Sequence, residues 1–231
     1  MKRGLGLFGF VCIGFLSATG WSAAQMAFAS DQNGNWEVYL INLHGGQFIN
    51  LTNHPDADYY PSWSPSGAEI AFFSGRDGNL EIYTLCLADR KLERLTTHPS
   101  TDKAPAWSPD GRKIAFTSNR SGHFDLYVMN PDGSDLVDLT NNPHEDEVPA
   151  WSPDSQQIVF HSKRDLNWDI YVIRVDGQRI ASTQDGGKSA VCSFKNASMG
   201  LIQVGPPLTG MRVQEKIRRE EFSQSVRHCK A

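Results

Sequence analysis

The sequence predicts an all-β protein, a β-propeller of about four four-stranded blades, and three observations lead to that prediction. Short motifs recur at a fixed step of 44 residues, glycine and proline are frequent, and the strand-like segments are apolar on both faces. A repeat length in the forties is that of one propeller blade. A sheet stacked between similar sheets must bury both of its faces, whereas an open sheet alternates apolar and polar residues.

The repeat is clearest in its aromatic positions. A Trp-Ser-Pro triplet stands in each of three units and a tyrosine in each of four, always 44 residues apart. We expect these side chains to pack between blades, because each removes a large apolar area from water. A stripe that binds sugar or peptide is the alternative, which repetition in every unit disfavours. The aromatic positions are Trp63, Trp107, Trp151, Tyr39, Tyr83, Tyr127 and Tyr171.

Turn residues divide each unit into four short strands. In the third unit we expect strands at 105–108, 113–118, 124–129 and 136–140. Glycine at Gly111, Gly122 and Gly133 supplies the positive φ that the intervening turns need. The proline beside each Trp-Ser places the first strand at a sheet edge. The first unit shows no first strand of its own, and the segment 200–204 is one candidate to supply it.

An arginine and an acid recur across the second hairpin of the units. They are Arg76 with Glu81, Arg120 with Asp125 and Arg164 with Asp169, and the first unit has Gln32 with Glu37. We expect cross-strand ion pairs on partly exposed hairpins, each contributing about 0–1 kcal/mol. We interpret these pairs as structural contacts rather than as a charged functional site.

The N-terminal segment 1–24 has the layout of a secretory signal peptide. Lys2 and Arg3 precede a short apolar run, which is followed by small residues up to Ala24, where we expect cleavage. We therefore expect a periplasmic or secreted protein without stable membrane insertion after cleavage, and an uncleaved membrane anchor is the alternative. Cleavage leaves Cys86, Cys192 and Cys229, an odd number, so at least one thiol stays unpaired in a monomer.

Charge divides the rest of the chain into two parts. The repeats occupy 25–184, and the non-repeat tail 185–231 carries a basic stretch for which we expect a surface helix at 211–228. Residues 25–210 hold 14 basic and 23 acidic residues. An acidic surface disfavours nucleic acid and anionic membranes as partners.

The repeated motifs resemble the TolB-type propeller repeat, also called the WD40-like or PD40 repeat. The resemblance covers about 25–184 and rests on three motifs: Pro105 to Gly111, Ile114 to Phe116, and Arg76 to Tyr83. It implies a propeller, usually of six or seven blades, and in TolB itself a protein-interaction role in the Tol–Pal envelope system. Similar repeats occur in prolyl-oligopeptidase-type peptidases. Four units leave three alternatives open: a closed four-bladed ring, an open arc that self-associates through its free edges, or a truncated propeller.

The candidate site lies just before each Trp-Ser-Pro triplet, where the resemblance implies that first strands line a central channel. The candidate partner-binding residues, all at the 44-residue step, are His54, Asp58, His98, Asp102 and Asp146, with Asn142 in the third histidine position. A ring of the three aspartates would hold Ca²⁺ through oxygen ligands or attract a basic peptide. The alternative is that each aspartate caps the loop leading into its strand.

No sequence motif indicates catalysis. The chain has no Gly-x-Ser-x-Gly elbow, HExxH pair or phosphate-binding loop. We therefore expect a non-enzymatic scaffold that binds a protein or peptide, with no cofactor other than the calcium considered above. The alternatives are an accessory propeller of a peptidase that lacks its hydrolase domain and a truncated propeller fragment.

Overall fold

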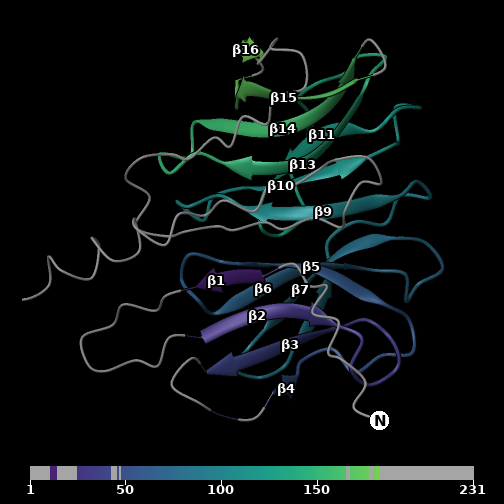
Figure 1. Ribbon diagram of the computed structural model, residues 1–231, viewed down its shortest axis with the longest axis vertical. Helices are drawn as coiled ribbons and strands as arrows, with labels where there is room; N and C mark the ends of the chain where they lie inside the picture. Colours follow the sequence, from purple (N-terminus) through teal and green to yellow (C-terminus); the bar gives the residue numbers. More distant parts are fainter. Residues whose placement is uncertain are drawn as a thin grey trace, which may run out of the picture.

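The computed structural model of the protein describes residues 11–14, 25–42, 46, 48–164, 167–176 and 179–182, where the regular structure is all β. The strands form four antiparallel sheets of four strands each, one for each unit of the repeat. Figure 1 shows the purple and blue strands of the first two units in the lower half of the view and the teal and green strands of the last two in the upper half. The predicted all-β propeller architecture is confirmed.

Each sheet takes its strands in chain order. Sheet 1 contains β1 (Val11–Gly14), β2 (Gln25–Ser30), β3 (Glu37–Asn42) and β4 (Ile49–Asn50). Sheet 2 contains β5 (Asp58–Trp63), β6 (Glu69–Ser74), β7 (Glu81–Cys86) and β8 (Leu92–Arg94). Sheet 3 contains β9 (Asp102–Trp107), β10 (Ile114–Ser118), β11 (Asp125–Met129) and β12 (Val137–Asp138). Sheet 4 contains β13 (Glu145–Trp151), β14 (Gln157–Arg164), β15 (Asn167–Arg174) and β16 (Arg179–Ser182).

The first strands lie at sheet edges, as their prolines predicted, but they are longer than expected. In sheet 3 the strand begins at Asp102 rather than Pro105. A β-bulge interrupts the pairing of β9 with β10, and Ala104, immediately before the proline, has a φ of 52°. Tyr60 and Val148 repeat this left-handed backbone at 54° and 57°. The bulge bends the strand without ending it. A prediction that used turn residues to mark strand ends therefore missed the first half of the strand.

The hairpin predictions hold in the third unit. Gly111, Gly122 and Gly133 have φ values of 74°, 105° and 84°, which residues with a Cβ rarely adopt. At Gly133 a Cβ would also lie 2.7 Å from the carbonyl oxygen of Leu95, so this turn packs against the backbone of sheet 2.

Apolar side chains fill the space between consecutive sheets. Trp63 packs with Val38 and Leu40 of sheet 1 as well as with residues of its own sheet. Trp107 joins sheets 2 and 3 in the same way, and Trp151 packs against the cluster between sheets 3 and 4. These three tryptophans therefore pack between consecutive sheets.

The repeated tyrosines are buried beside a phenylalanine on the neighbouring strand. The ring centroids of Phe72 and Tyr83 lie 5.8 Å apart, and the equivalent pairs in the other sheets are 5.8–5.9 Å apart. One aromatic pair therefore marks the same place in every sheet.

The first unit does have a first strand, contrary to the sequence interpretation. β1 pairs with β2 in the edge position that β5 takes beside β6. It went unnoticed because it has no Trp-Ser-Pro triplet and lies inside the apolar run interpreted as a signal peptide. Each sheet contacts the next, and among the described residues no strand of sheet 1 contacts a strand of sheet 4.

Several predictions fall outside the described residues. These are the remainder of the signal segment, the candidate strand at 200–204, the tail with its helix at 211–228, and two of the cysteines, Cys192 and Cys229. Cys86 is a free thiol. In the described ranges, no helix has the length and apolar character needed to cross a membrane.

Candidate functional site

All five predicted partner-binding residues lie on one rim of the stack, which we call the hairpin rim. It consists of the hairpins between the second and third strands and of the loops that lead into β5, β9 and β13. Antiparallel pairing brings these segments to the same end of the sheets. Hydrogen bonds also join each hairpin to the following unit: the amides of Asp58, Asp102 and Asp146 donate to the carbonyls of Trp36, Leu80 and Phe124, respectively, over 2.6–2.8 Å.

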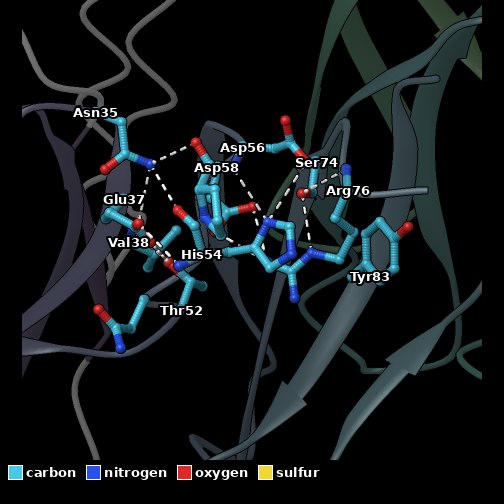
Figure 2. Close-up of polar contacts among 12 residues, drawn as sticks. Asn35, Glu37, Val38, Thr52, His54, Asp56, Asp58, Ser74, Arg76 and Tyr83 are labelled. Carbon is cyan, nitrogen blue, oxygen red and sulfur yellow. Dashed lines mark hydrogen bonds and ion pairs between the residues drawn. The ribbon is translucent and has the colours of Figure 1, made fainter. Parts of the chain in front are cut away.

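In sheets 1 to 3, a buried acid at the start of the third strand organises the loop that leads from the fourth strand into the next sheet. Figure 2 shows Glu37 accepting hydrogen bonds from the Thr52 hydroxyl (2.5 Å), the Asn35 amide (3.0 Å) and the His54 backbone (2.9 Å). Asn35 also donates to the His54 carbonyl over 2.6 Å. Glu81 and Asp125 bind Thr96 and Thr140 in the same way. A Leu-Thr pair recurs at the 44-residue step, at positions 51–52, 95–96 and 139–140, and its threonine is thus the hydrogen-bond partner of this acid.

The three candidate aspartates are buried and each is paired with an arginine of its own sheet. Asp58 is fully buried, and both of its carboxylate oxygens accept from Nη2 of Arg76 over 2.9 Å. Arg120 donates to Asp102 over 2.7 Å, and an Arg164 nitrogen lies 3.8 Å from Asp146.

The predicted cross-strand pairing of these arginines with Glu81, Asp125 and Asp169 is therefore wrong. The Ser74 hydroxyl accepts from Arg76 Nε over 3.0 Å, an orientation that leaves the terminal nitrogens facing the first strand (Figure 2). The oxygens of Glu81 are already occupied by Thr96, Asn79 and Arg94. The expectation of exposed, weak pairs is wrong as well, because the aspartates have no exposed surface.

Each guanidinium also lies over one or both rings of the aromatic pair in its sheet. The Arg76 group is 5.4 Å from the Phe72 ring centre and 5.1 Å from that of Tyr83. Arg120 repeats this arrangement in sheet 3, and Arg164 lies 4.0 Å from the Tyr171 ring. An aspartate, an arginine and two rings thus form one stack in sheets 2 and 3, and an aspartate, an arginine and one ring do so in sheet 4. Each stack links the first strand of its sheet to the second and third.

The candidate histidines shape the rim loops. Nδ1 of His54 accepts from the backbone of Asp56 over 3.1 Å, and Nδ1 of His98 accepts from Ser100 over 3.2 Å. In the third unit the Asn142 side chain accepts from the His144 backbone over 3.0 Å. These contacts explain why asparagine replaces histidine at this position, since both side chains supply an acceptor two residues before the same amide.

The predicted cation ring is not assembled. Across the described ranges, no group of three or more histidine, cysteine, aspartate or glutamate side chains is placed to hold a metal ion. Each aspartate faces an arginine rather than the aspartates of neighbouring sheets. The loop-capping alternative does not describe the aspartates either, because their carboxylates pair with arginine side chains rather than with loop amides. Asp146 also accepts from the Asn142 side chain over 2.6 Å.

A second polar group lies on the first strands and was missed by the sequence analysis. Lys103 on β9 pairs with Glu147 on β13 over 3.1 Å, and its ammonium lies 3.8 Å from the Phe124 ring centre. Burial, followed by the negative charge of Glu147, raises the pKa of Tyr60 on β5. Because β9 contacts both β5 and β13, these three residues lie on neighbouring first strands of sheets 2, 3 and 4. Lys103 and Glu147 occupy the same repeat position, 44 residues apart, and Tyr60 lies one position further along its own unit. The residue types differ from unit to unit, so a search for repeated residues does not single them out.

Exposed charge on the hairpin rim is mainly acidic. Asp31, Asp56 and Asp77 are exposed, whereas Arg76, Arg120 and Arg164 expose only 10–15% of their side chains. These three guanidinium groups are therefore turned toward the buried Asp58, Asp102 and Asp146, whereas Asp31, Asp56 and Asp77 face solvent. Asp77 also pairs with Arg94 over 3.3 Å. Such a surface attracts cationic groups rather than anions.

Comparison with known proteins agrees with the geometry. The Tricorn protease N-terminal beta propeller domain matches residues 78–199, more than half of the chain, and the TolB beta propeller domain matches 13–103. The protein is thus a propeller-type β protein. It belongs to the family of the Tricorn protease N-terminal beta propeller domain and carries the TolB-type repeat. No curated protein matches the sequence closely enough to count as a relative.

Solved structures give the same fold. A putative TolB from Agrobacterium tumefaciens is 27% identical with a TM-score of 0.63, over 68% of this chain and 60% of that one. TolB from Acinetobacter baumannii is 25% identical with a TM-score of 0.58, over 66% of this chain and 38% of that one. A Mycobacterium tuberculosis puromycin-hydrolyzing peptidase shares the fold at 17% identity and a TM-score of 0.55, over 68% and 26% of the two chains. The chain thus spans 60% or less of each of these proteins.

Proposed function

We propose that this protein is an exported, non-enzymatic β-propeller scaffold whose hairpin rim binds a basic segment of a protein or peptide. The observation that carries the proposal is the division of charge on the rim, where Asp31, Asp56 and Asp77 are exposed while Arg76 and Arg120 are largely buried against aspartates of their own sheets. The likeness to TolB supports a binding role by analogy, since a shared fold alone does not determine function.

The rim has the rigidity that a binding surface needs. Its hairpins are tied to the following unit by the Asn35 and Asn79 side chains, which donate to the His54 and His98 carbonyls over 2.6 Å and 2.8 Å. Loops held in this way lose little conformational entropy when a partner binds. The acidic groups supply long-range attraction, and the histidine rings offer partly exposed contacts beside them.

The test compares two triple variants with equal changes in charge. Peptides are first selected from a random display library on the wild-type protein, and the tightest binder is then measured by fluorescence anisotropy. Neutralising the rim (Asp31→Asn, Asp56→Asn, Asp77→Asn) should weaken binding about tenfold, because three screened contacts of about 0.5 kcal/mol each are lost. The matched control neutralises exposed acids of the opposite rim (Asp89→Asn, Asp132→Asn, Asp154→Asn) and should leave binding unchanged. Equal losses in both variants, or selected peptides without net positive charge, would refute the proposal.

A second candidate function follows from the family match itself. The matching family is the propeller of a protease, so an accessory propeller that serves a separate hydrolase domain is the alternative function. Purification of the protein from its native cells, followed by labelling with a fluorophosphonate probe for serine hydrolases, distinguishes the two. A labelled hydrolase that co-purifies in equal amount with this chain would favour the accessory role, and its absence would favour the scaffold.

Export is the remaining part of the proposal. Mass spectrometry of the protein from the periplasm or medium should find Gln25 as the first residue if the segment 1–24 is removed as a signal peptide. Cleavage there would also remove β1 and expose the free edge of β2. A cytoplasmic protein that retains Met1 would contradict export.

A further inference from the structure

The repeat shows what should cover each face of each sheet. We call the face toward the preceding sheet the leading face and the face toward the following sheet the trailing face. The trailing face of sheet 2 includes Ala71, Phe73 and Thr84, all buried against sheet 3. The equivalent residues are also buried in sheets 1 and 3, and they are Ala27, Ala29, Leu40, Ala115, Thr117 and Val128.

The equivalent residues on the trailing face of sheet 4 are less buried than those of sheets 1 to 3. Val159 and Val172 are only half-buried there, and His161 is exposed. Its leading face, which includes Phe160 and Ile173, is buried against sheet 3 as in the other units. One side of the last sheet is therefore packed, and the other, His161 apart, is apolar and has no covering sheet among the described residues.

Sheet 1 shows the opposite asymmetry. Its trailing face is buried, whereas Met26, Phe28 and Ile41 on its leading face are half-buried. The equivalent leading-face residues of sheets 2 to 4 are all buried, and they are Ile70, Phe72, Leu85, Ile114, Phe116, Met129, Ile158, Phe160 and Ile173. Phe48, with half of its surface exposed, packs edge-on against Phe28 with ring centres 5.6 Å apart and leaves this apolar surface open.

We propose that two copies of this chain pair head to tail, the trailing face of sheet 4 in one copy packing on the leading face of sheet 1 in the other. Each copy carries one face of each kind, so the same contact forms twice and the assembly closes with two-fold symmetry. The product is a ring of eight sheets, which lies within the range of known propellers.

A second copy is the occupant that the internal interfaces indicate. In all three of them a trailing face is covered by a leading face, and like faces never meet. Sheet 1 presents a leading face of the usual composition, with Phe28 stacked on Tyr39 as Phe72 is on Tyr83. The proposal does not depend on peptide binding at the hairpin rim.

Sedimentation velocity of the full chain over a wide concentration range tests the assembly. We expect the mass of two chains, with dissociation on dilution. The mass of one chain at every concentration would overturn the proposal, because the two faces would then be covered within the chain or left bare. Open polymers of increasing size would overturn ring closure.

A mixing experiment tests which faces meet. Val172→Asp places a charge on the trailing face of sheet 4, and Ile41→Asp places one on the leading face of sheet 1; both positions are half-buried, so the sheets themselves should tolerate the change. Each variant alone should be a monomer, because both of its contacts carry one buried charge. An equimolar mixture should recover the dimer, since one of its two contacts is unmodified.

The control and the contrary outcomes are equally defined. Val137→Asp, on the outer edge of sheet 3 with half of its surface exposed, should remain dimeric. A circular dichroism melt confirms that each variant is folded. If Val172→Asp is not, Val172→Lys replaces it, and Ile41→Lys replaces Ile41→Asp in the same way. If one of the two face variants remains dimeric by itself, like faces pair and the proposal is wrong; a mixture that stays monomeric contradicts it too.

Discussion

Sheets 3 and 4 carry the same repeat but differ in what surrounds them. Sheet 3 lies between two neighbours, and there Arg120 donates to Asp102 over 2.7 Å and Val128 is buried. In sheet 4, which has a neighbouring sheet on one side within the described part of the chain, the equivalent arginine–aspartate distance is 3.8 Å and the equivalent Val172 is half-buried. Burial is thus set by the neighbouring sheet, and each unit depends on the next for part of its stability.

The largest expected difference concerns the buried ion pairs. Asp102→Ala leaves a guanidinium without its partner inside the sheet and should lower the free energy of unfolding by about 3–5 kcal/mol. Asp146→Ala should cost about 1–3 kcal/mol, because its arginine is held less closely and the sheet is open on one side. Urea denaturation gives both values. Asp132→Ala, at an exposed turn, is the control and should change stability by less than about 0.5 kcal/mol. Equal losses at Asp102 and Asp146 would show that the neighbouring sheet has no influence.

A smaller difference is expected between two valines at the same repeat position. Val128→Ala removes two buried methyl groups and should cost about 2 kcal/mol. Val172→Ala should cost about half as much at dilute concentration, because its side chain is already partly in water. The change of residue is identical, so chemical denaturation of the two variants isolates the effect of the neighbour. A larger loss at Val172 would contradict the comparison.

The smallest expected effect is the response of sheet 3 to alkaline pH. Burial, followed by a hydrogen bond to Asp138, raises the pKa of Tyr127 to about 12. The unfolded tyrosine has a pKa of about 10, so the stabilisation by this group is complete below pH 10 and is lost as the pH rises toward 12. Tyr127→Phe should therefore weaken the dependence of unfolding free energy on pH in that window. Absorbance at 295 nm should also lose one late-titrating tyrosine, and an unchanged titration would contradict this assignment.

Periodicity predicted most of the fold because it reports packing directly. The 44-residue step located the sheets, and the proline beside each tryptophan identified the edge strands. The sequence analysis did not predict β1, because composition alone does not distinguish a strand without the Trp-Ser-Pro triplet from any other apolar run.

The polar contacts were harder to predict because several partners compete for each group. Arg76 stands five residues before Glu81 and eighteen after Asp58, and spacing favoured the nearer acid. The structure pairs it with Asp58, since Glu81 is occupied by Thr96 and Arg94. One signal was available: the first unit lacks both members of the true pair, with Gly14 and Gln32 at the two positions. Residues that are lost together within a repeat are candidates for contact.

Hydrogen–deuterium exchange at a concentration where the protein is monomeric tests the dependence on neighbours most directly. The amides of β10 and β11 should exchange only through global unfolding, whereas those of β14 and β15 should exchange faster through separate opening of sheet 4. Equal protection in the two sheets, or stronger protection in sheet 4, would contradict the account.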